Sequence, residues 1–353
     1  MKTGKSLTEL AMELERQSEA KTDYIVNTSA LEMTQNGELA IESDSHQELH
    51  QEFPITAHAH SQIAARLDIP AKYYNRMLNE APELLAANVN EWFHSKPERR
   101  MVRTLDGSMR AFLSNRYRRL DNFDLAEAVL PILLEMGEGI KIVSTELTES
   151  RMYVKVINER LELEVKKDDV VQAGIVISNS EVGSGALKVE PLIYRLVCTN
   201  GMIAQDYSKR RYHVGRNAEE GEAYELFRDE TLKADDHAFF LKVQDTVRAA
   251  VDVAKFSMIV DQMRSATEQR IEGNPVAAVE VLSEKFGYST GEKSGILTHL
   301  IQGGDLSAYG LLNAITRTSQ DLEDYDRSTE LERDGSRVLS LPASTWKTIA
   351  MAK

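Results

Sequence analysis

The sequence of 353 residues contains a single cysteine, Cys198, so no disulfide can form within the chain. A chain without disulfides is typical of reducing compartments, and we therefore expect a cytoplasmic location. No stretch is apolar over the length that a membrane span needs. The first residues alternate charged and apolar positions and lack the apolar core of a signal peptide. These absences argue against a disulfide-stabilised secreted scaffold and against a membrane partner.

Motifs that carry catalysis are also missing. There is no Gly-x-Ser-x-Gly nucleophile elbow and no His-Glu-x-x-His metal motif. The segment from Gly287 to Ser294 is close to a phosphate-binding P-loop, but its second glycine comes one residue early and a helix is expected before it. Four histidines lie between residues 46 and 60 without a cysteine or regularly spaced carboxylates, which favours a surface loop over a metal site. We therefore predict no catalytic residue, no metal and no cofactor.

Positive charge is scarce overall: 42 lysine and arginine residues stand against 56 aspartate and glutamate residues, and the formal net charge is −14. This balance argues against a generic histone-like binder. Residues 96–120 are the exception, with eight positive and two negative side chains and a local net charge of +6, so that the other residues sum to −20. Like charges packed this closely repel each other, and an anionic ligand would offset the repulsion. The alternative is a solvated strand pair whose arginines contact carboxylates of the chain itself.

A second basic segment, residues 207–216, mixes positive charge with aromatic side chains in the same way. Arginines would contact phosphates and tyrosines, including Tyr207, would stack on bases, as in proteins that bind single-stranded nucleic acid. The residues predicted to bind nucleic acid are Arg99, Arg100, Arg103, Arg110, Arg116, Tyr117, Arg118, Arg119, Lys209, Arg210, Arg211, Tyr212, His213 and Arg216.

Hydrophobic periodicity predicts an α+β fold with a central antiparallel sheet, flanking helices and a helical C-terminal part. Asn36-Gly37 and Asp106-Gly107 are dipeptides that favour tight hairpin turns, and the second would place the basic residues 96–120 on a β-hairpin. Four strands are expected over residues 140–207, with Cys198 buried in the last of them. Helices in the first half are expected at residues 1–20, twice within 57–79 with the second beginning at Pro70, at 81–94, and after a cap at Asp121 or Asn122.

The sequence becomes helical beyond residue 218. One long helix is expected at residues 236–270, followed by shorter helices at 275–286, 292–301 and 306–318. The charged tail from Gln320 is expected to be mobile as far as Val338-Leu339. A boundary near residue 218 therefore divides residues 1–217, a mixed α+β body that carries the basic hairpin, from residues 218–353, a helical part with a charged tail.

Four segments are distinctive when taken together. They are Ala111–Asp121 (AFLSNRYRRLD), Ser178–Gly183 (SNSEVG), Tyr194–Met202 (YRLVCTNGM) with the basic-aromatic stretch that ends in His213 and Gly215, and Gly310–Thr316 (GLLNAIT). In this order and spacing they resemble the phage/plasmid-like protein family catalogued as domain of unknown function 932, over residues 20–320. The resemblance implies a phage, prophage or plasmid gene and a role near mobile DNA, without an established activity.

These observations lead to one main hypothesis and two alternatives. The main hypothesis is a non-catalytic protein that binds nucleic acid, with single-stranded DNA as the expected partner. It would act in annealing or as an accessory to recombination or replication, by fold-level analogy with single-strand annealing proteins. The first alternative is an assembly protein that forms homo-oligomers when the basic hairpin docks on the acidic segments 219–236 or 321–334 of another copy. The second is an enzyme that acts on nucleic acid through a carboxylate-bound divalent metal.

Overall fold

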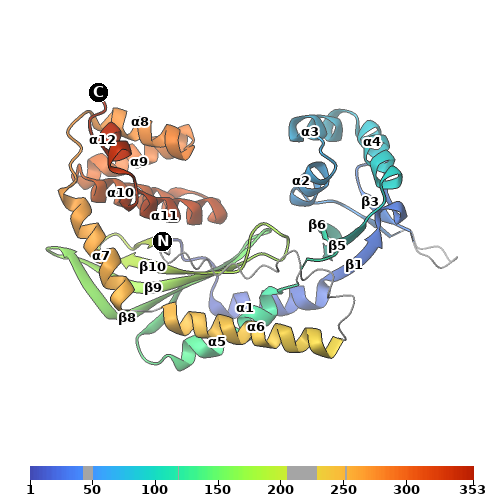
Figure 1. The fold of residues 1–353 in the computed structure, drawn as a ribbon, viewed down its shortest axis with the longest axis horizontal. Helices are drawn as coiled ribbons and strands as arrows, with labels where there is room; N and C mark the ends of the chain where they lie inside the picture. Colours follow the sequence, from blue (N-terminus) through green and yellow to red (C-terminus); the bar gives the residue numbers. More distant parts are fainter. Residues whose placement is uncertain (43–50, 118, 205–228, 251–252) are drawn as a thin grey trace.

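The computed structural model describes residues 1–42, 51–117, 119–204, 229–250 and 253–353. It confirms the α+β class, because helices flank three antiparallel sheets and the C-terminal part is helical. The largest sheet occupies the middle of the molecule (Figure 1). An N-terminal lobe (described residues of 22–114) stands at one end of this sheet, and a helical lobe (residues 253–353) stands at the other. Within the described part, no helix has the length and apolarity to cross a membrane.

The central sheet has five strands in the order β11-β10-β9-β8-β7, each antiparallel to its neighbours. They are β7 (Ile140–Leu147), β8 (Met152–Lys166), β9 (Asp169–Asn179), β10 (Lys188–Arg195) and β11 (Asn200–Ile203). The structure therefore has two strands, β10 and β11, where the sequence predicts a single one. Residues 196–199 form the turn between them, and Thr199 takes a left-handed conformation with φ of 49°. Cys198 lies half-buried in this turn, so its predicted place inside a strand is wrong.

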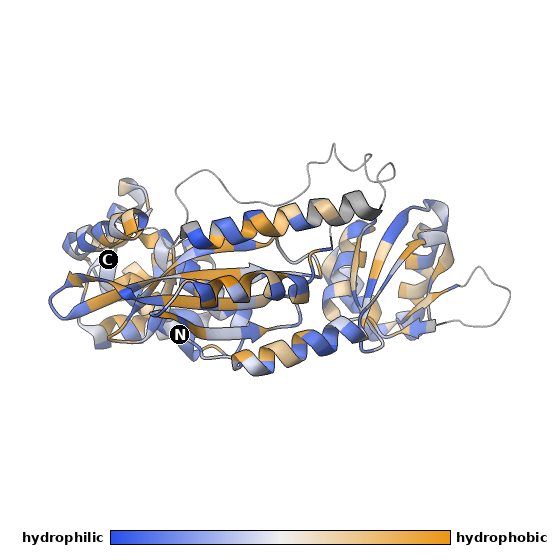
Figure 2. Cartoon of the chain, turned by 90° about the horizontal axis from the view of Figure 1, so that it is seen from below, coloured by the Kyte–Doolittle hydropathy of each residue, from blue (hydrophilic) through white to orange (hydrophobic). Residues whose placement is uncertain are grey.

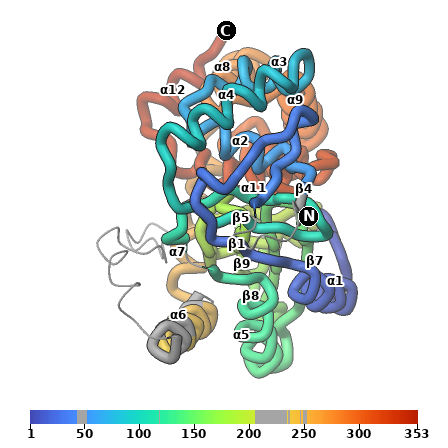
Figure 3. The backbone as a smooth tube through the Cα atoms, turned by 90° about the vertical axis from the view of Figure 1, so that its right-hand side faces the viewer, coloured from blue at the N-terminus to red at the C-terminus, as the bar shows by residue number. Residues whose placement is uncertain are grey.

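Three helices lie on one face of the central sheet, the lower face in Figure 1: α1 (Leu7–Ala20), α5 (Asn122–Glu135) and α6 (Asp229–Ala250). Figure 2 looks onto this face from below, and Figure 3 labels the three helices from the side. Their apolar side chains share a core with alternate residues of β8 and β9, among them Val154 and Ile175. The predicted long helix 236–270 is instead α6 followed by α7 (Val253–Glu268). The two helices contribute to different hydrophobic cores. Val243 of α6 packs in the core that also contains side chains of α5, whereas Val260 of α7 packs in the core of the helical lobe.

The helical lobe continues with α8 (Pro275–Phe286), α9 (Thr290–Gly303), α10 (Ala308–Thr318), a 3-10 turn (Ser319–Asp321), α11 (Tyr325–Leu339) and α12 (Ala343–Ala350). The prediction of a mobile tail from Gln320 is wrong, because α11 packs against the sheet. Lys155 of β8 and Glu332 of α11 are both fully buried, and their Nζ and Oε2 atoms lie 2.6 Å apart. The high charge of this segment therefore reflects ion pairs within the chain.

The near-match to a P-loop has a structural explanation in this lobe. Gly287 ends α8 in the left-handed conformation, with φ of 74°. Ser289 and Glu292 form a reciprocal capping box at the start of α9. The glycines and polar residues of this segment therefore end one helix and begin the next.

The N-terminal lobe contains two sheets, β1-β5-β6 and β2-β3-β4. The strands are β1 (Thr22–Asn27), β2 (Leu31–Met33), β3 (Leu39–Ile41), β4 (Gln51–Phe53), β5 (Arg99–Leu105) and β6 (Ser108–Ser114), with a 3-10 turn at Thr28–Ala30. The helices are α2 (Ala57–Arg66), α3 (Ala71–Glu80) and α4 (Pro82–Ser95). Both predicted hairpins are confirmed. In the basic hairpin β5–β6, Asp106 and Gly107 have φ of 50° and 74°, as a tight turn of the favoured hand requires.

Candidate nucleic-acid interface

Arg103, on β5 of the basic hairpin, is fully buried. Its Nε donates to Oδ1 of Asp23 at 2.7 Å, its Nη2 to Oδ1 of Asp121 at 2.7 Å, and its Nη1 to the carbonyl oxygen of Glu181 at 3.0 Å. Burial alone would lower the pKa of the guanidinium group, but the two carboxylates outweigh burial and raise it. Arg103 thus ties β1, the start of α5 and the loop after β9 together. It has no surface for a phosphate to contact, and we remove it from the predicted interface.

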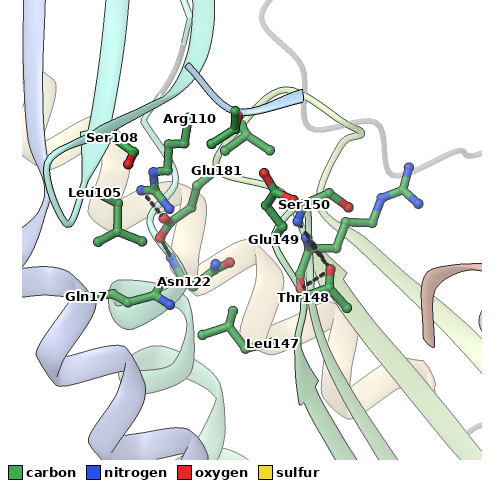
Figure 4. A pocket seen from close by; sticks show the side chains of 13 residues that line it. Gln17, Leu105, Ser108, Arg110, Asn122, Leu147, Thr148, Glu149, Ser150 and Glu181 are labelled. Atoms are coloured by element: carbon green, nitrogen blue, oxygen red, sulfur yellow. Dashed lines mark hydrogen bonds and ion pairs between the residues drawn. The ribbon is translucent and has the colours of Figure 1, made fainter. Parts of the chain in front are cut away.

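Arg110, on β6, is also nearly buried and paired. Its Nη2 donates to Oε2 of Glu181 at 2.6 Å, and Oε1 of Glu181 accepts from the backbone N–H of Asn122 at 2.6 Å. Glu181 therefore accepts the hydrogen bond of the first backbone N–H of α5, which has no acceptor within the helix (Figure 4). Asp121 occupies the N-cap position as predicted, but its side chain makes no capping bond, because its carboxylate pairs with Arg103. Arg110 leaves the predicted interface for the same reason as Arg103.

Tyr117 is not an open platform for base stacking. Its hydroxyl donates to the carbonyl oxygen of Ser180 at 2.8 Å, and its ring packs against a small apolar cluster that includes Leu113. Among the described aromatic side chains, Tyr73 on α3 and Trp92 on α4 are exposed, at 48% and 41%, and Nζ of Lys96 lies 5.2 Å from the ring centre of Trp92. The sequence interpretation missed Trp92, because position 92 comes three residues after the buried Val89 and seven after the buried Leu85, so helical spacing places it at the edge of the buried face.

Two exposed arginines meet at the open end of the basic hairpin. The strand register pairs Arg100 with Ser114, which places Arg99 beside the segment that carries Arg116, and both arginines are exposed. With Trp92 and Lys96, which precede β5, they form what we call the open-end cluster. Arg119 is also exposed but lies farther along the hairpin, because its Nε is 3.5 Å from Asp23, the β1 partner of Arg103.

Arg100 is half-buried at the edge of the open-end cluster. Its Nη2 lies 2.7 Å from Oε1 of Glu98, and its guanidinium carbon lies 5.5 Å from the ring centre of Phe112. The remaining predicted residues lie outside the described residues. They are Arg118, Lys209, Arg210, Arg211, Tyr212, His213 and Arg216, with Tyr207.

The segment Ser178–Gly183, distinctive in the sequence, consists of the end of β9 and the start of the loop after it, and it joins the N-terminal lobe to the central sheet. Nδ2 of Asn179 donates to the carbonyl oxygen of Leu120 at 2.8 Å and to Oδ1 of Asn122 at 2.9 Å. The carbonyl oxygen of Val182 accepts from Nε2 of Gln62, on α2, at 2.7 Å. These hydrogen bonds pair polar groups of the segment Ser178–Gly183 with the start of α5 and with α2, as buried polar groups require.

Two of the four clustered histidines also serve packing. Nε2 of His58 lies 2.9 Å from the carbonyl oxygen of Val182, and Nδ1 of His60 lies 2.9 Å from the hydroxyl of Tyr74. Both lie on α2 and not in a loop, while the other two histidines fall outside the described residues. In the part of the chain that the structure describes, no group of three or more histidine, cysteine, aspartate or glutamate side chains could hold a metal ion.

Comparison with known proteins gives one finding. A family model described as Domain of unknown function (DUF932) matches residues 111–338. This range begins within β6 and includes the segments Ser178–Gly183 and Gly310–Thr316. No curated protein and no solved structure matches the chain.

Proposed function

Because the chain belongs to the domain of unknown function 932 family, whose description assigns no activity, we propose a function from its own surface. The protein binds single-stranded nucleic acid, DNA in the first instance, through the open-end cluster and without catalysis. Its role is that of an accessory in recombination or replication of mobile DNA, including strand annealing.

The observation that carries this proposal is the meeting of two sequence segments at the open end of the basic hairpin. Arg99 comes from the start of β5 and Arg116 follows β6, yet the strand register brings their segments side by side, and Arg119 adds an exposed positive charge farther along the hairpin, next to Asp23. Positive side chains on an otherwise acidic chain suit a phosphate backbone, whose binding releases condensed counterions. Trp92, where α4 leads into β5, adds an aromatic face on which a base of any identity can stack.

The two alternatives lack a comparable observation. The assembly hypothesis needs free carboxylates at residues 321–334, where Glu330, Glu332 and Asp334 pair with basic residues of the same chain and the exposed acidic residues are few, among them Glu323 and Asp324. The acidic segment 219–236 falls largely outside the described residues. The enzyme hypothesis needs a carboxylate cluster, and none of metal-binding size occurs among the described side chains.

The test replaces Arg99, Arg116 and Arg119 by alanine together and measures binding of a fluorescent oligothymidylate by anisotropy at several salt concentrations. If all three arginines contact phosphates, the slope of log affinity against log salt should fall by about 2, since each contact to a single strand contributes about 0.7. A separate Trp92→Ala variant should lower affinity about tenfold with an unchanged slope, because stacking does not release counterions.

A matched control replaces three arginines that lie away from the hairpin, Arg160, Arg264 and Arg270, by alanine. Their side chains are 65%, 44% and 56% exposed, and the change in net charge is the same. The control should keep the salt slope of the wild type. Equal losses in both triple variants, or a wild type that binds no oligonucleotide at low salt, would refute the proposal.

A further inference from the structure

Two helices of the N-terminal lobe and the turn between them form a helix-turn-helix unit. Helix α2 ends at Arg66, residues 67–70 follow, and α3 begins at Ala71. Asp68 takes the left-handed conformation, with φ of 55°, and the backbone N–H of Ile69 donates to the carbonyl oxygen of Ala64 at 2.9 Å. This bond ends α2 and turns the chain sharply into α3. A short turn of this kind joins the two helices of DNA-binding helix-turn-helix units.

The packing of the two helices determines which face of α3 points outward. Ile63 of α2, Ile69 of the turn and Met77 of α3 are buried together in the core of the N-terminal lobe. His60 of α2 and Tyr74 of α3 are buried as well, and Nδ1 of His60 lies 2.9 Å from the hydroxyl of Tyr74. Through this face α3 packs against α2 and α4, at the outer end of the lobe (Figure 1). The opposite face of α3 is therefore turned to solvent.

The solvent-facing side of α3 is polar and suited to reading base edges. Its exposed side chains include Lys72, Tyr73, Asn75, Arg76 and Asn79. In the major groove, arginine pairs with guanine and asparagine with adenine, each through two hydrogen bonds. Recognition helices contact bases with their N-terminal residues, and residues 71–76 carry two positive side chains and no carboxylate. Arg76 pairs with Glu80 at 2.8 Å, but the two side chains are 71% and 64% exposed, so the pair is weak and opens readily.

Positive charge lies beside the helix-turn-helix unit, where the phosphates of a duplex would pass. Arg66, in the last turn of α2, pairs with Glu98 at 2.5 Å, and Glu98 also pairs with Arg100 of β5 at 2.7 Å. The shared carboxylate places the end of α2 next to the start of the basic hairpin, where Arg99 is exposed. Three arginines against one glutamate leave this edge positive, and phosphate contacts of this kind position a helix-turn-helix unit on DNA.

We propose that α2 and α3 form a second nucleic-acid site, which binds double-stranded DNA with α3 in the major groove. Asn75, Arg76 and Asn79 read base edges, Lys72 contacts a phosphate, and α2 crosses the backbone. The site lies outside residues 111–338, the range that matches the family. It goes beyond the proposed function, because it takes a duplex and distinguishes base sequences, whereas the open-end cluster takes a single strand of any sequence.

The test selects duplexes that bind the full chain from a library of random-sequence double-stranded DNA, over repeated rounds with sequencing. The wild type should enrich one sequence motif. The α3 variant, with Asn75, Arg76 and Asn79 all replaced by alanine, should bind the enriched duplex at least about tenfold less tightly, the value of one two-bond base contact. All three side chains are exposed and alanine favours a helix, so the variant should keep the wild-type circular dichroism spectrum. An Arg160→Ala variant removes the same charge at a side chain that is 65% exposed on β8, and should bind as the wild type does.

Several results would overturn the proposal. They are the absence of an enriched motif, equal affinity of the wild type and the α3 variant for the enriched duplex, or an equal loss for the enriched duplex and a scrambled one. Oligothymidylate separates the two proposals. The α3 variant should keep its affinity for oligothymidylate, whereas the variant of Arg99, Arg116 and Arg119 should lose it and still prefer the enriched duplex to the scrambled one. Loss of oligothymidylate binding in the α3 variant would assign α3 to the single strand and overturn its assignment to a duplex.

Discussion

Replacing Arg103 by methionine should destabilise the fold and should do so through the carboxylates left behind. Asp23 and Asp121 are 12% and 14% exposed, and Arg103 donates to both at 2.7 Å. Removing one partner of a buried ion pair typically costs about 3–5 kcal/mol, and the lower end applies here because Asp121 keeps Lys21 at 2.5 Å and Asp23 keeps Arg119 at 3.5 Å. We expect a loss of this size in the free energy of unfolding, measured by urea denaturation.

Arg119 provides the matched control because it contacts the same Asp23. Its side chain is 46% exposed and its Nε lies 3.5 Å from the carboxylate. An exposed pair of this kind contributes less than about 1 kcal/mol, so Arg119→Met should leave the urea midpoint almost unchanged. Equal effects of the two substitutions, or a loss below about 1 kcal/mol for Arg103→Met, would refute the assignment of Arg103 to the fold.

The effect of Arg103→Met should also depend on pH. Burial alone would raise the pKa of Asp121, but Arg103 and Lys21 outweigh burial and lower it. The contribution of this ionised carboxylate to the free energy of unfolding is fully present above the pKa of the carboxyl in the unfolded chain, about 4. It is lost as the pH falls through the lower pKa of the folded state. The stability difference between wild type and variant should therefore shrink below about pH 4.

Two further predictions concern buried groups elsewhere. Lys155→Met should lower the free energy of unfolding, measured in urea, by about 3–5 kcal/mol, because it leaves the carboxylate of Glu332 buried and unpaired. The double variant Lys155→Met with Glu332→Leu should recover most of that loss. Failure of the second substitution to recover stability would contradict this account. Burial lowers the pKa of His60 from 6.5 to about 4, so the folded protein should lose up to about 3 kcal/mol as the pH falls from 6.5 to 4, while the unfolded chain takes up the proton. A His60→Asn variant, in which the amide can still pair with Tyr74, should lack this pH dependence in the same assay.

The sequence predicts the local elements well where short-range chemistry decides them. Asp106-Gly107 and Asn36-Gly37 mark both hairpins, since few other residues take positive φ. The sequence-based prediction is wrong where packing against distant parts of the chain determines the structure, as it does for α11. The charge of α11 suggests a solvated tail, but Glu332 and Arg333 face Lys155 and Glu190 of the central sheet.

The candidate interface shows the same division. A count of charges finds the basic segment but cannot tell the buried, paired Arg103 from the exposed Arg99. Arg103 is paired because Asp23 and Asp121 lie beside it in the fold, and they are 80 and 18 residues away in the sequence. The exposure of Trp92 is likewise not predictable from the sequence, because position 92 comes seven residues after the buried Leu85 and helical spacing alone places it beside the apolar face.

The bond between Glu181 and Arg110 has a consequence for cutting the protein into pieces. The segment shared with the family begins at Ala111, in the middle of β6. A fragment trimmed to that start would lose β5, and with it the backbone partner of β6, and would lose Arg110 while keeping Glu181. The unit that folds is therefore larger than the unit that sequence comparison recognises, and dissection of this chain should retain the strands upstream of that start.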